Sequence, residues 1–371
     1  MKVALLSFHN AVNYGATLQA YALEKYLLEQ GVDCEYIDYR NHYRRTAYSM
    51  SYHIWTSLRK KDLKGGLKYL LGYPFMALRR VRFYAFYKKN IKCTKKVYNS
   101  VEEVKELNPY YDKFIVGSDQ VWNHTNNGED FAFLLNFVDD DFKKISYSSS
   151  FGLSEIPSHL TDLYSKYLLK INKISVREAY GVDLVKKLTG RNAKLVLDPV
   201  FLLSKQQWES LSPQKKIKKP YLFFYTNKAN QISDFLKQTK YCLNGKTLYK
   251  LSRNMSFSDF LDNQIKVKYT MSPNEFIRVI RDAELIISAS FHCISLAIIL
   301  NKPFIAILTG NQGKDERIIN ILRLLGLENR AFTPNMEDSD VLLPINYETV
   351  NTKIQELLFD STKFLMDSIR I

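Results

Sequence analysis

His292 is the side chain that the sequence places best for acid–base chemistry. It follows an apolar strand expected over Leu285–Ser288, and after Ser290 it opens an apolar helix expected over His292–Leu300. The free backbone N–H groups and the dipole at a helix N-terminus favour an anion, and an imidazole can give or take a proton near neutral pH. A phosphate-bearing ligand would therefore meet an acid–base group here. A histidine that only caps the turn fits the same pattern.

A second group of polar side chains directly follows the apolar strand expected over Lys113–Gly117. Ligands bind open α/β sheets at the carboxyl ends of the strands, so side chains at this position are well placed to meet one. Trp122 could stack on a sugar face, whereas Ser118 and Asp119 could simply cap the next helix. The candidates for ligand contact in this run are Ser118, Asp119, Gln120, Trp122 and Asn123.

Arg177 and Glu178 follow another expected strand, Ile174–Val176. A guanidinium group can hold a phosphate or a carboxylate through two parallel hydrogen bonds, so Arg177 is a candidate anion anchor. An internal ion pair between Arg177 and Glu178 is the alternative.

The loop Asn13-Tyr14-Gly15 joins the first expected strand to the first expected helix. It contains neither the GxGxxG pattern of dinucleotide-binding proteins nor the P-loop pattern, so neither kind of site is supported. Asp198-Pro199, after the strand expected over Lys194–Leu197, is interpreted as a turn at a strand end.

Short apolar strands alternate with amphipathic helices along the chain, which favours parallel sheets with right-handed crossovers. The first strand is expected over Lys2–Phe8, and the helix after it has an apolar face that ends before Gly31. In the second half, Ser272 is followed by Pro273 and Glu275, the residues of a capping box at a helix start.

With 371 residues the chain is long for a single hydrophobic core. A charged linker, Ser212–Lys219, precedes the second series of strands. We therefore expect an α/β protein with a Rossmann-like domain over residues 1–211, a second one over 212–345 and a helical segment over 346–371. Two such domains would face a central cleft at the carboxyl ends of both sheets.

The net charge of +15 comes from one stretch. Residues 40–96 contain sixteen Lys or Arg, one acidic residue and eleven aromatic residues, and the rest of the chain is electrically balanced. A basic, aromatic, partly helical insertion suits an anionic membrane surface. A solvated helical face is an equal alternative, and no nucleic-acid-binding motif accompanies the stretch.

Several classes of protein are excluded by the remaining composition. The best apolar run, Ile294–Leu300, has seven residues, far fewer than the roughly 20 of a membrane span. Met1–Ser7 lacks the features of a signal peptide. The four cysteines lie far apart and outside any Cys/His cluster, so we expect reduced thiols, no metal site and a cytoplasmic location.

Seven motifs occur in order from residue 3 to about residue 330: HNAVNYGATLQAYAL, IVGSDQVWN, ISYSSSFG, ISVRE, LVLDPV, SFH and NKPFIAI. Together they resemble the polysaccharide pyruvyl transferase family. The resemblance implies a glycosyltransferase-B-like (GT-B-like) fold, with two Rossmann-like domains around a cleft. It also implies a role in cell-surface polysaccharide biosynthesis, in which pyruvate from phosphoenolpyruvate forms a ketal on two saccharide hydroxyls and phosphate is released.

By this resemblance His292 is the expected general acid, Arg177 the anion anchor, and Asp119 the group that activates a hydroxyl or binds the sugar. The family usually has glycine after SFH, where this chain has Cys293, which we interpret as an inert buried thiol. Phosphoenolpyruvate is a co-substrate, so no cofactor is expected. The residues expected to bind substrate are Asn13, Tyr14, Gly15, Ser118, Gln120, Trp122, Asn123, Glu178, Ser290 and Arg317.

Two other functions fit the same sequence. The first is a glycosyltransferase with a nucleotide-sugar donor, and the second is a non-catalytic saccharide-binding protein. If the chain is a pyruvyl transferase, its partners would be phosphoenolpyruvate and a saccharide that could be lipid-linked. The enzyme would then act in the cytoplasm, where the basic insertion could hold it at the inner membrane face.

Overall fold

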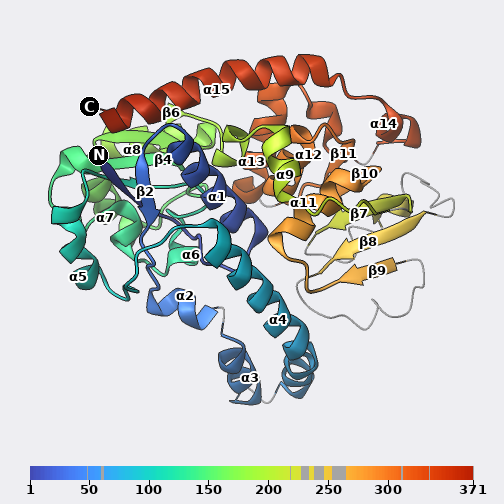
Figure 1. Ribbon diagram of the computed structural model, residues 1–371, viewed down its shortest axis with the longest axis horizontal. Coiled ribbons are helices and arrows are strands. Elements are labelled where there is room, and N and C mark those ends of the chain that lie inside the picture. The colour runs from blue at the N-terminus through green and yellow to red at the C-terminus, as the bar shows by residue number, and fades with distance from the viewer. Residues whose placement is uncertain are drawn as a thin grey trace.

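Two parallel β-sheets flanked by helices make up the chain (Figure 1). The computed structural model describes residues 1–47, 49–59, 62–217, 219–226, 234–237, 246–252, 265–310, 312–333 and 335–370. The helices that cover the sheets and connect them are α1 (Tyr14–Glu29), α5 (Val101–Val104), α6 (His124–Asn127), α7 (Ser158–Leu169), α8 (Ala179–Thr189), α9 (Lys205–Leu211), α11 (Pro273–Asp282), α12 (Phe291–Ile299), α13 (Gln312–Leu325), α14 (Asp338–Leu342) and α15 (Tyr347–Arg370).

The first sheet has the order β2-β1-β3-β4-β5-β6, and all its strand pairs are parallel. Strand β2 lies on one side of β1, whereas β3 and the strands after it lie on the other side. The strand order therefore reverses between β1 and β3, and a switch point lies at the carboxyl ends of these two strands. The strands are β1 (Lys2–Leu6), β2 (Asp33–Tyr36), β3 (Lys113–Val116), β4 (Lys144–Ser149), β5 (Lys173–Val176) and β6 (Lys194–Leu195).

The first connection shows why the sequence folds this way. The Asn13 side chain accepts hydrogen bonds from Gly15 N and Ala16 N, so it caps α1 directly after the turn that follows β1. The helix ends before Gly31, whose φ of 77° is easily adopted only by glycine. The expected strand, helix and stop signal are confirmed, although β1 ends two residues earlier than predicted.

The second sheet has the order β11-β10-β7-β8-β9 and is also parallel throughout. Its switch point lies between β7 and β10. The capping box of α11 is confirmed, because the Ser272 hydroxyl accepts from Glu275 N while Ser272 N donates to the Glu275 carboxylate. The strands are β7 (Tyr221–Tyr225), β8 (Thr247–Leu251), β9 (Ile265–Lys268), β10 (Leu285–Ser288) and β11 (Phe304–Ala306).

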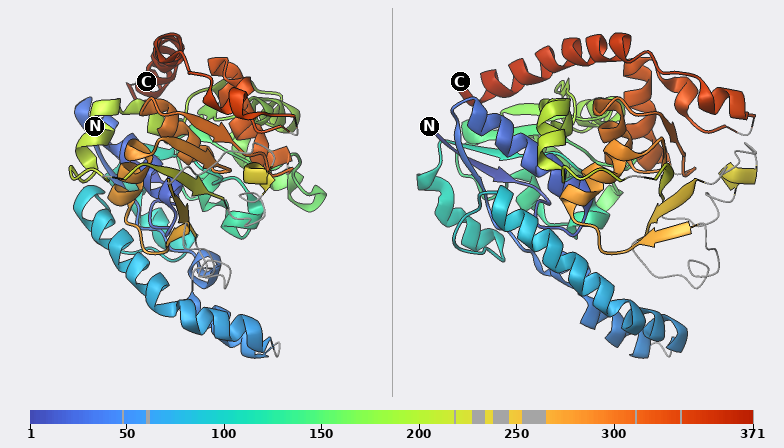
Figure 2. Two further views of the ribbon diagram at one scale, coloured as in Figure 1. Left: turned by 90° about the vertical axis from the view of Figure 1, so that its right-hand side faces the viewer. Right: turned by 45° about the vertical axis from the view of Figure 1, so that its right-hand side comes forward.

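The basic insertion forms α2 (His42–Ala47), α3 (Met50–Arg59) and the long α4 (Leu63–Asn90). Helices α3 and α4 pair and project from the body of the molecule, as both views of Figure 2 show. The C-terminal half of α4 packs against the second domain as well as facing solvent. Arg79 donates to Tyr269 O and Ser252 O, and Arg82 forms an ion pair with Glu275.

The C-terminal helix α15 runs back over the first domain (Figure 1). Leu365 and Ile369 pack into the core around β1, and the Ser361 hydroxyl accepts a hydrogen bond from Leu197 N. Among the described helices, none is both long and apolar enough to span a membrane. Cys34, Cys93 and Cys293 are free thiols, and Cys242 lies outside the described residues.

Candidate active site

The carboxyl ends of the two sheets meet at His292. Its helix, α12, starts after β10 at the switch point of the second sheet, and the imidazole reaches the start of α1 in the first domain. A Cβ atom at Gly15 would lie only 2.1 Å from His292 Nδ1. The ring can occupy this position because residue 15 has no side chain.

Asp198 connects His292 to the first domain. Its Oδ2 atom accepts hydrogen bonds from Arg177 Nη1 at 2.7 Å and from the Ser118 hydroxyl at 2.8 Å, and it lies 3.4 Å from His292 Nε2. Burial alone would raise the pKa of this carboxyl group. The nearby His292 and Arg177 and the hydrogen bond from Val200 N outweigh burial and hold the pKa well below its usual range. Asp198 is therefore a carboxylate.

Arg177 follows β5 and is almost completely buried. Beyond its bond to Asp198, its Nη2 lies 3.9 Å from Asp119 Oδ1, and its Nε lies 3.9 Å from Glu178 Oε2. The guanidinium stacks 4.7 Å from the centre of the Phe291 ring, across the domain interface. Neither Nε nor Nη2 has a hydrogen-bond partner in the part of the chain that the structure describes. Buried donors without partners are expected where a ligand binds.

Arg317, on α13, adds a second cation from the other domain. Its Nε is also buried without a hydrogen-bond partner among the described residues. Burial, and then the positive charge of Arg177, lower the pKa of Arg317 to about 10, because two buried guanidinium groups repel each other. An anion between them would relieve this repulsion.

The carboxyl groups of Asp119 and Glu178 complete a cluster with Arg177, Asp198 and His292. Asp119 has a φ of 74°, a left-handed conformation that is uncommon for a residue with a side chain. Burial raises its pKa, but His292, Arg177 and Arg317 outweigh burial, so the net shift is downward. Burial instead keeps the pKa of Glu178 above its usual value, while its Oε1 accepts from the Ser150 hydroxyl and Phe151 N.

A model of the family described as "Polysaccharide pyruvyl transferase" matches residues 13–311. This range includes Gly15, Asp119, Arg177, Asp198 and His292, while Arg317 lies just beyond it. The chain belongs to the polysaccharide pyruvyl transferase family. It is therefore a transferase of polysaccharide biosynthesis that acts on a saccharide-related substrate. A comparison with curated proteins finds none that matches.

Comparison with solved structures supports the GT-B-like fold that is expected of a pyruvyl transferase. Staphylococcus aureus MnaA bound to UDP has a TM-score of 0.50 at 10% identity, over 96% of this chain and 89% of that chain. The Neisseria meningitidis UDP-GlcNAc 2-epimerase has a TM-score of 0.47 at 11% identity, over 97% and 100%. Escherichia coli ADP-heptose LPS heptosyltransferase II has a TM-score of 0.37 at 10% identity, over 98% and 100%. Only the first of these reaches a TM-score of 0.50, and at 10% identity that likeness concerns the fold alone.

Four of the predicted site residues of this family member lie in the cluster itself: Asp119, Arg177, Glu178 and His292. The Ser118 hydroxyl donates a hydrogen bond to Asp198, and Arg317 adds a positive charge beside the cluster. Gly15 leaves the space that the His292 ring occupies. Asp198 was interpreted as a turn and proves to be the centre of the cluster. The available signal was its position after a strand, the same signal that singled out Asp119.

The prediction that Trp122 stacks on a sugar is wrong. Its side chain is fully buried, donates from Nε1 to Phe133 O and packs against Phe151 in the core of the first domain. Burial of the large apolar surface of the indole in the core stabilises the fold more than its exposure to solvent at a strand end would. Tyr14 is also buried: its hydroxyl donates to Met271 O, and its ring stacks on Phe276, so it joins the two domains.

The remaining candidates have local structural partners. Asn13 caps α1 and Asn123 caps α6 through their side-chain oxygens. Gln120 accepts from Asn126 Nδ2, and its own Nε2 is buried without a partner among the residues described. Ser290 occupies the N-cap position of α12 without a side-chain capping bond.

Cys293 is fully buried, as expected for a structural thiol. Burial, opposed in part by a hydrogen bond with Ser288, raises the pKa of Cys293 to about 12, so the thiol stays protonated and unreactive at neutral pH. Within the described residues, no group of three His, Cys, Asp or Glu side chains is arranged to hold a metal ion.

Proposed function

We propose that this transferase moves pyruvate from phosphoenolpyruvate onto two hydroxyls of a saccharide, forming a ketal and releasing inorganic phosphate. One observation carries the proposal: Arg177 and Arg317 approach from different domains and present buried guanidinium donors without hydrogen-bond partners among the described residues. Phosphoenolpyruvate carries a phosphate and a carboxylate, which two such cations can bind together.

The acid–base groups suit the reaction that follows. A proton delivered to C3 of phosphoenolpyruvate turns its methylene into a methyl group and leaves a cation at C2, to which the first hydroxyl adds. Phosphate then leaves C2 and the second hydroxyl takes its place. Of the two hydroxyl protons, one balances the proton taken up at C3 and the other leaves with the phosphate.

His292 is the proposed proton donor, because it is the imidazole in the cluster and Asp198 orients its Nε2 edge. Asp119 is the proposed acceptor of a hydroxyl proton, because its carboxylate lies beside Arg177 and stays ionised. Arg177 and Arg317 would stabilise the negative charge that develops on the departing phosphate.

We also propose that the hairpin of α3 and α4 holds the enzyme on an anionic membrane surface, close to its acceptor. Its described part exposes large apolar and aromatic side chains, including Trp55, Leu70, Leu71 and Tyr73. Basic residues dominate the same stretch of sequence. Exposed apolar groups together with basic charge are the combination that anionic lipid surfaces bind. Arg79 and Arg82 take no part, because they contact the second domain.

The test is an assay of phosphate release with the purified full chain, phosphoenolpyruvate and a set of saccharide acceptors. Phosphate release that depends on both substrates is expected. Release of a nucleoside diphosphate from a nucleotide sugar, with no phosphate from phosphoenolpyruvate, would instead identify a glycosyltransferase and overturn the proposal.

A further inference from the structure

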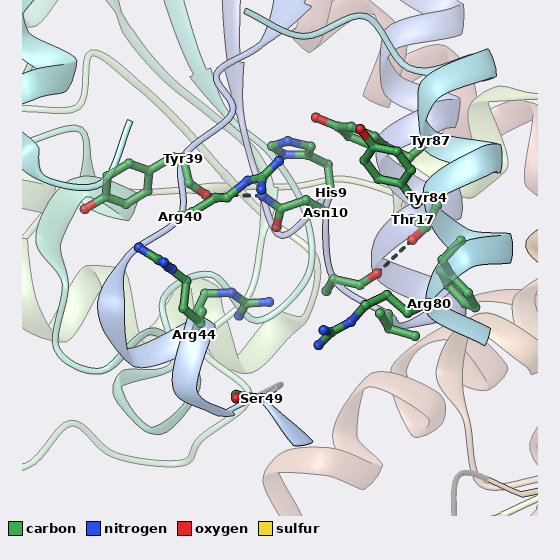
Figure 3. A pocket seen from close by; sticks show the side chains of 14 residues that line it. His9, Asn10, Thr17, Tyr39, Arg40, Arg44, Ser49, Arg80, Tyr84 and Tyr87 are labelled. Atoms are coloured by element: carbon green, nitrogen blue, oxygen red, sulfur yellow. Dashed lines mark hydrogen bonds between the residues drawn. The ribbon is translucent and has the colours of Figure 1, made fainter. Parts of the chain in front are cut away.

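A large pocket lies beside the cluster, at the base of the projecting hairpin. It has a volume of about 390 Å³ and is enclosed by the loop after β1, the segment after β2, helix α2 and helix α4. Its lining includes none of the cluster residues Asp119, Arg177, Asp198 or His292. Figure 3 shows the arginine, tyrosine and histidine side chains that surround it.

The pocket adjoins the cluster through the start of α1. Thr17 lines the pocket, while Gly15, two residues earlier, contacts His292. Two residues of helix span about 3 Å. The first turn of α1 therefore lies between the pocket and the imidazole of His292, and a ligand that serves both would have to be long enough to pass around this turn.

Four arginines line the pocket, and its lining contains no acidic side chain. Arg40 is held by a bidentate pair with Asp38, both bonds being 2.8 Å. The guanidinium of Arg44 lies 3.4 Å from the centre of the Phe8 ring, which fixes its position, and Arg80 is exposed. With Arg45 included, the pocket keeps a clear excess of positive charge, which favours an anion.

His9 supplies a different kind of group. Its Nδ1 lies 3.1 Å from Ser7 O, and because a carbonyl oxygen can only accept, Nδ1 must carry the hydrogen. Burial, opposed by Asp38, lowers the pKa of His9 to about 4, so the ring is neutral and Nε2 has a free lone pair. Nε2 is fully buried and has no hydrogen-bond partner among the residues that the structure describes. An acceptor of this kind suits a ligand hydroxyl.

Aromatic faces complete the wall. Phe83, Tyr84 and Tyr87 on α4 line the pocket, and Tyr87 also stacks on the His9 ring. Aromatic rings pack well against the apolar faces of sugar rings and against hydrocarbon. The pocket thus combines cationic donors, a neutral hydroxyl acceptor and apolar surface.

We propose that this pocket binds the acceptor substrate, a saccharide that carries a phosphate or diphosphate group, with the phosphate on Arg44 and Arg80 and a sugar hydroxyl on His9 Nε2. The assignment rests on the proposed pyruvyl transfer and adds the chemical class of the acceptor. The saccharide would extend past Thr17 toward His292, where its hydroxyls would meet the pyruvyl group.

Titration calorimetry with the full chain tests the pocket without turnover. The probes are inorganic pyrophosphate, glucose 1-phosphate and uncharged glucose, each with and without saturating phosphoenolpyruvate. We expect the two phosphate probes to bind in the presence of phosphoenolpyruvate and to bind at least about tenfold more tightly than glucose. Loss of their binding when phosphoenolpyruvate is present would place them in the Arg177 cluster and overturn the proposal.

Variants locate the binding within the pocket. Arg44→Gln with Arg80→Gln should weaken binding of both phosphate probes by at least about tenfold and leave phosphoenolpyruvate affinity unchanged. His9→Phe keeps an aromatic ring but removes the acceptor, so it should weaken the binding of glucose 1-phosphate and leave the binding of pyrophosphate unchanged. Lys89→Gln with Lys95→Gln removes two exposed charges outside the pocket and serves as the matched control. Equal binding by the arginine variant and this control would contradict the proposal.

Two further probes distinguish the sources of the phosphate group. Farnesyl diphosphate stands for a lipid-linked acceptor and UDP for a nucleotide-linked one, and whichever binds more tightly through Arg44 and Arg80 identifies the carrier. Binding of neither would overturn the assignment. None of these binding measurements depends on catalysis. If the probes do not bind in the pocket, the phosphate-release assay can still give a positive result. If phosphate is not released, the measured affinities for the pocket still stand.

Discussion

Gly15 and His292 belong to different domains and touch at the point where two helices begin. A Cβ atom on Gly15 would lie 2.1 Å from His292 Nδ1, so the glycine leaves the space that the imidazole fills. Helices α1 and α12 both direct their N-termini to this point. Two helix dipoles that converge on one place favour an anion there, in addition to the charges of Arg177 and Arg317.

Gly15→Ala should displace His292 and slow the reaction strongly. A shift of about 1 Å in a reacting group can cost about 100-fold in rate, so we expect a loss of that order in kcat with little change in melting temperature. Gly72→Ala is the matched control, because among the described residues no atom beyond its own helix turn lies within 4 Å of a Cβ at that position. Full activity of Gly15→Ala would mean that the position of His292 does not matter for catalysis.

Arg177→Lys should weaken the binding of phosphoenolpyruvate, because lysine keeps the charge but loses the planar fork that can hold two oxygens. A loss of about tenfold in affinity is expected by calorimetry. Arg191→Lys is the control, since among the described residues the Arg191 guanidinium donates to backbone carbonyls near the end of α7. If Arg177→Lys and Arg177→Ala both bind phosphoenolpyruvate like the wild type, Arg177 is only an ion-pair partner of Asp198.

Asp198→Asn should destabilise the fold, because it leaves Arg177 buried without its counter-charge. Breaking a buried pair from one side typically costs about 3 kcal/mol or more in free energy of unfolding. The pKa of Asp198 is lower in the folded chain than in the unfolded one. Its stabilising effect is therefore complete above the unfolded value, near 4, and is lost as the pH falls through the folded value.

Urea unfolding of the wild type and of Asp198→Asn from pH 8 downwards measures this effect. The difference in free energy of unfolding should be constant down to about pH 5 and shrink below pH 4. Asp139→Asn, at a site whose side chain has no partner in the cluster, should show no such difference. A difference that grows as the pH falls would contradict the assigned charge state.

The membrane proposal predicts that the chain co-sediments with anionic vesicles and not with neutral ones. Binding should weaken as salt rises, because the basic charges are screened. Trp55→Ser with Leu70→Ser and Leu71→Ser should reduce it strongly. Phe142→Ser with Phe359→Ser removes two even more exposed aromatic side chains elsewhere on the surface and should leave vesicle binding unchanged. Absence of binding to either kind of vesicle would leave the hairpin a solvated face, and equal binding to both would contradict the role of its basic charge.

Local sequence signals were enough to predict most elements of the fold. Strand Leu285–Ser288 and the capping box at Ser272 occur where their residue patterns indicate them. Strands β8 and β9 were not predicted. Lys250 and Lys266 interrupt their short apolar patterns, and these segments become strands because β8 pairs with β7 and β9 pairs with β8.

The site was predictable to the extent that it depends on strand ends. Asp119, Arg177 and His292 each follow a strand, and parallel sheets collect such residues at one edge. The contact of His292 with Gly15 and Asp198 depends on how the two domains pack, which no local pattern encodes. Trp122 was misplaced for a related reason, because its burial depends on Phe133 and Phe151, which are distant in sequence.

The most direct test of the central claim is the fate of the proton at C3 of phosphoenolpyruvate. The transferase should be run in D₂O with phosphoenolpyruvate and an accepted saccharide, and the product followed by NMR together with the released phosphate. Pyruvyl transfer with protonation at C3 predicts one deuterium in the ketal methyl group and one phosphate per ketal. His292→Gln should lower the rate by about 10²–10⁴-fold with the fold retained. A product without deuterium, or turnover of His292→Gln at the wild-type rate, would contradict the claim.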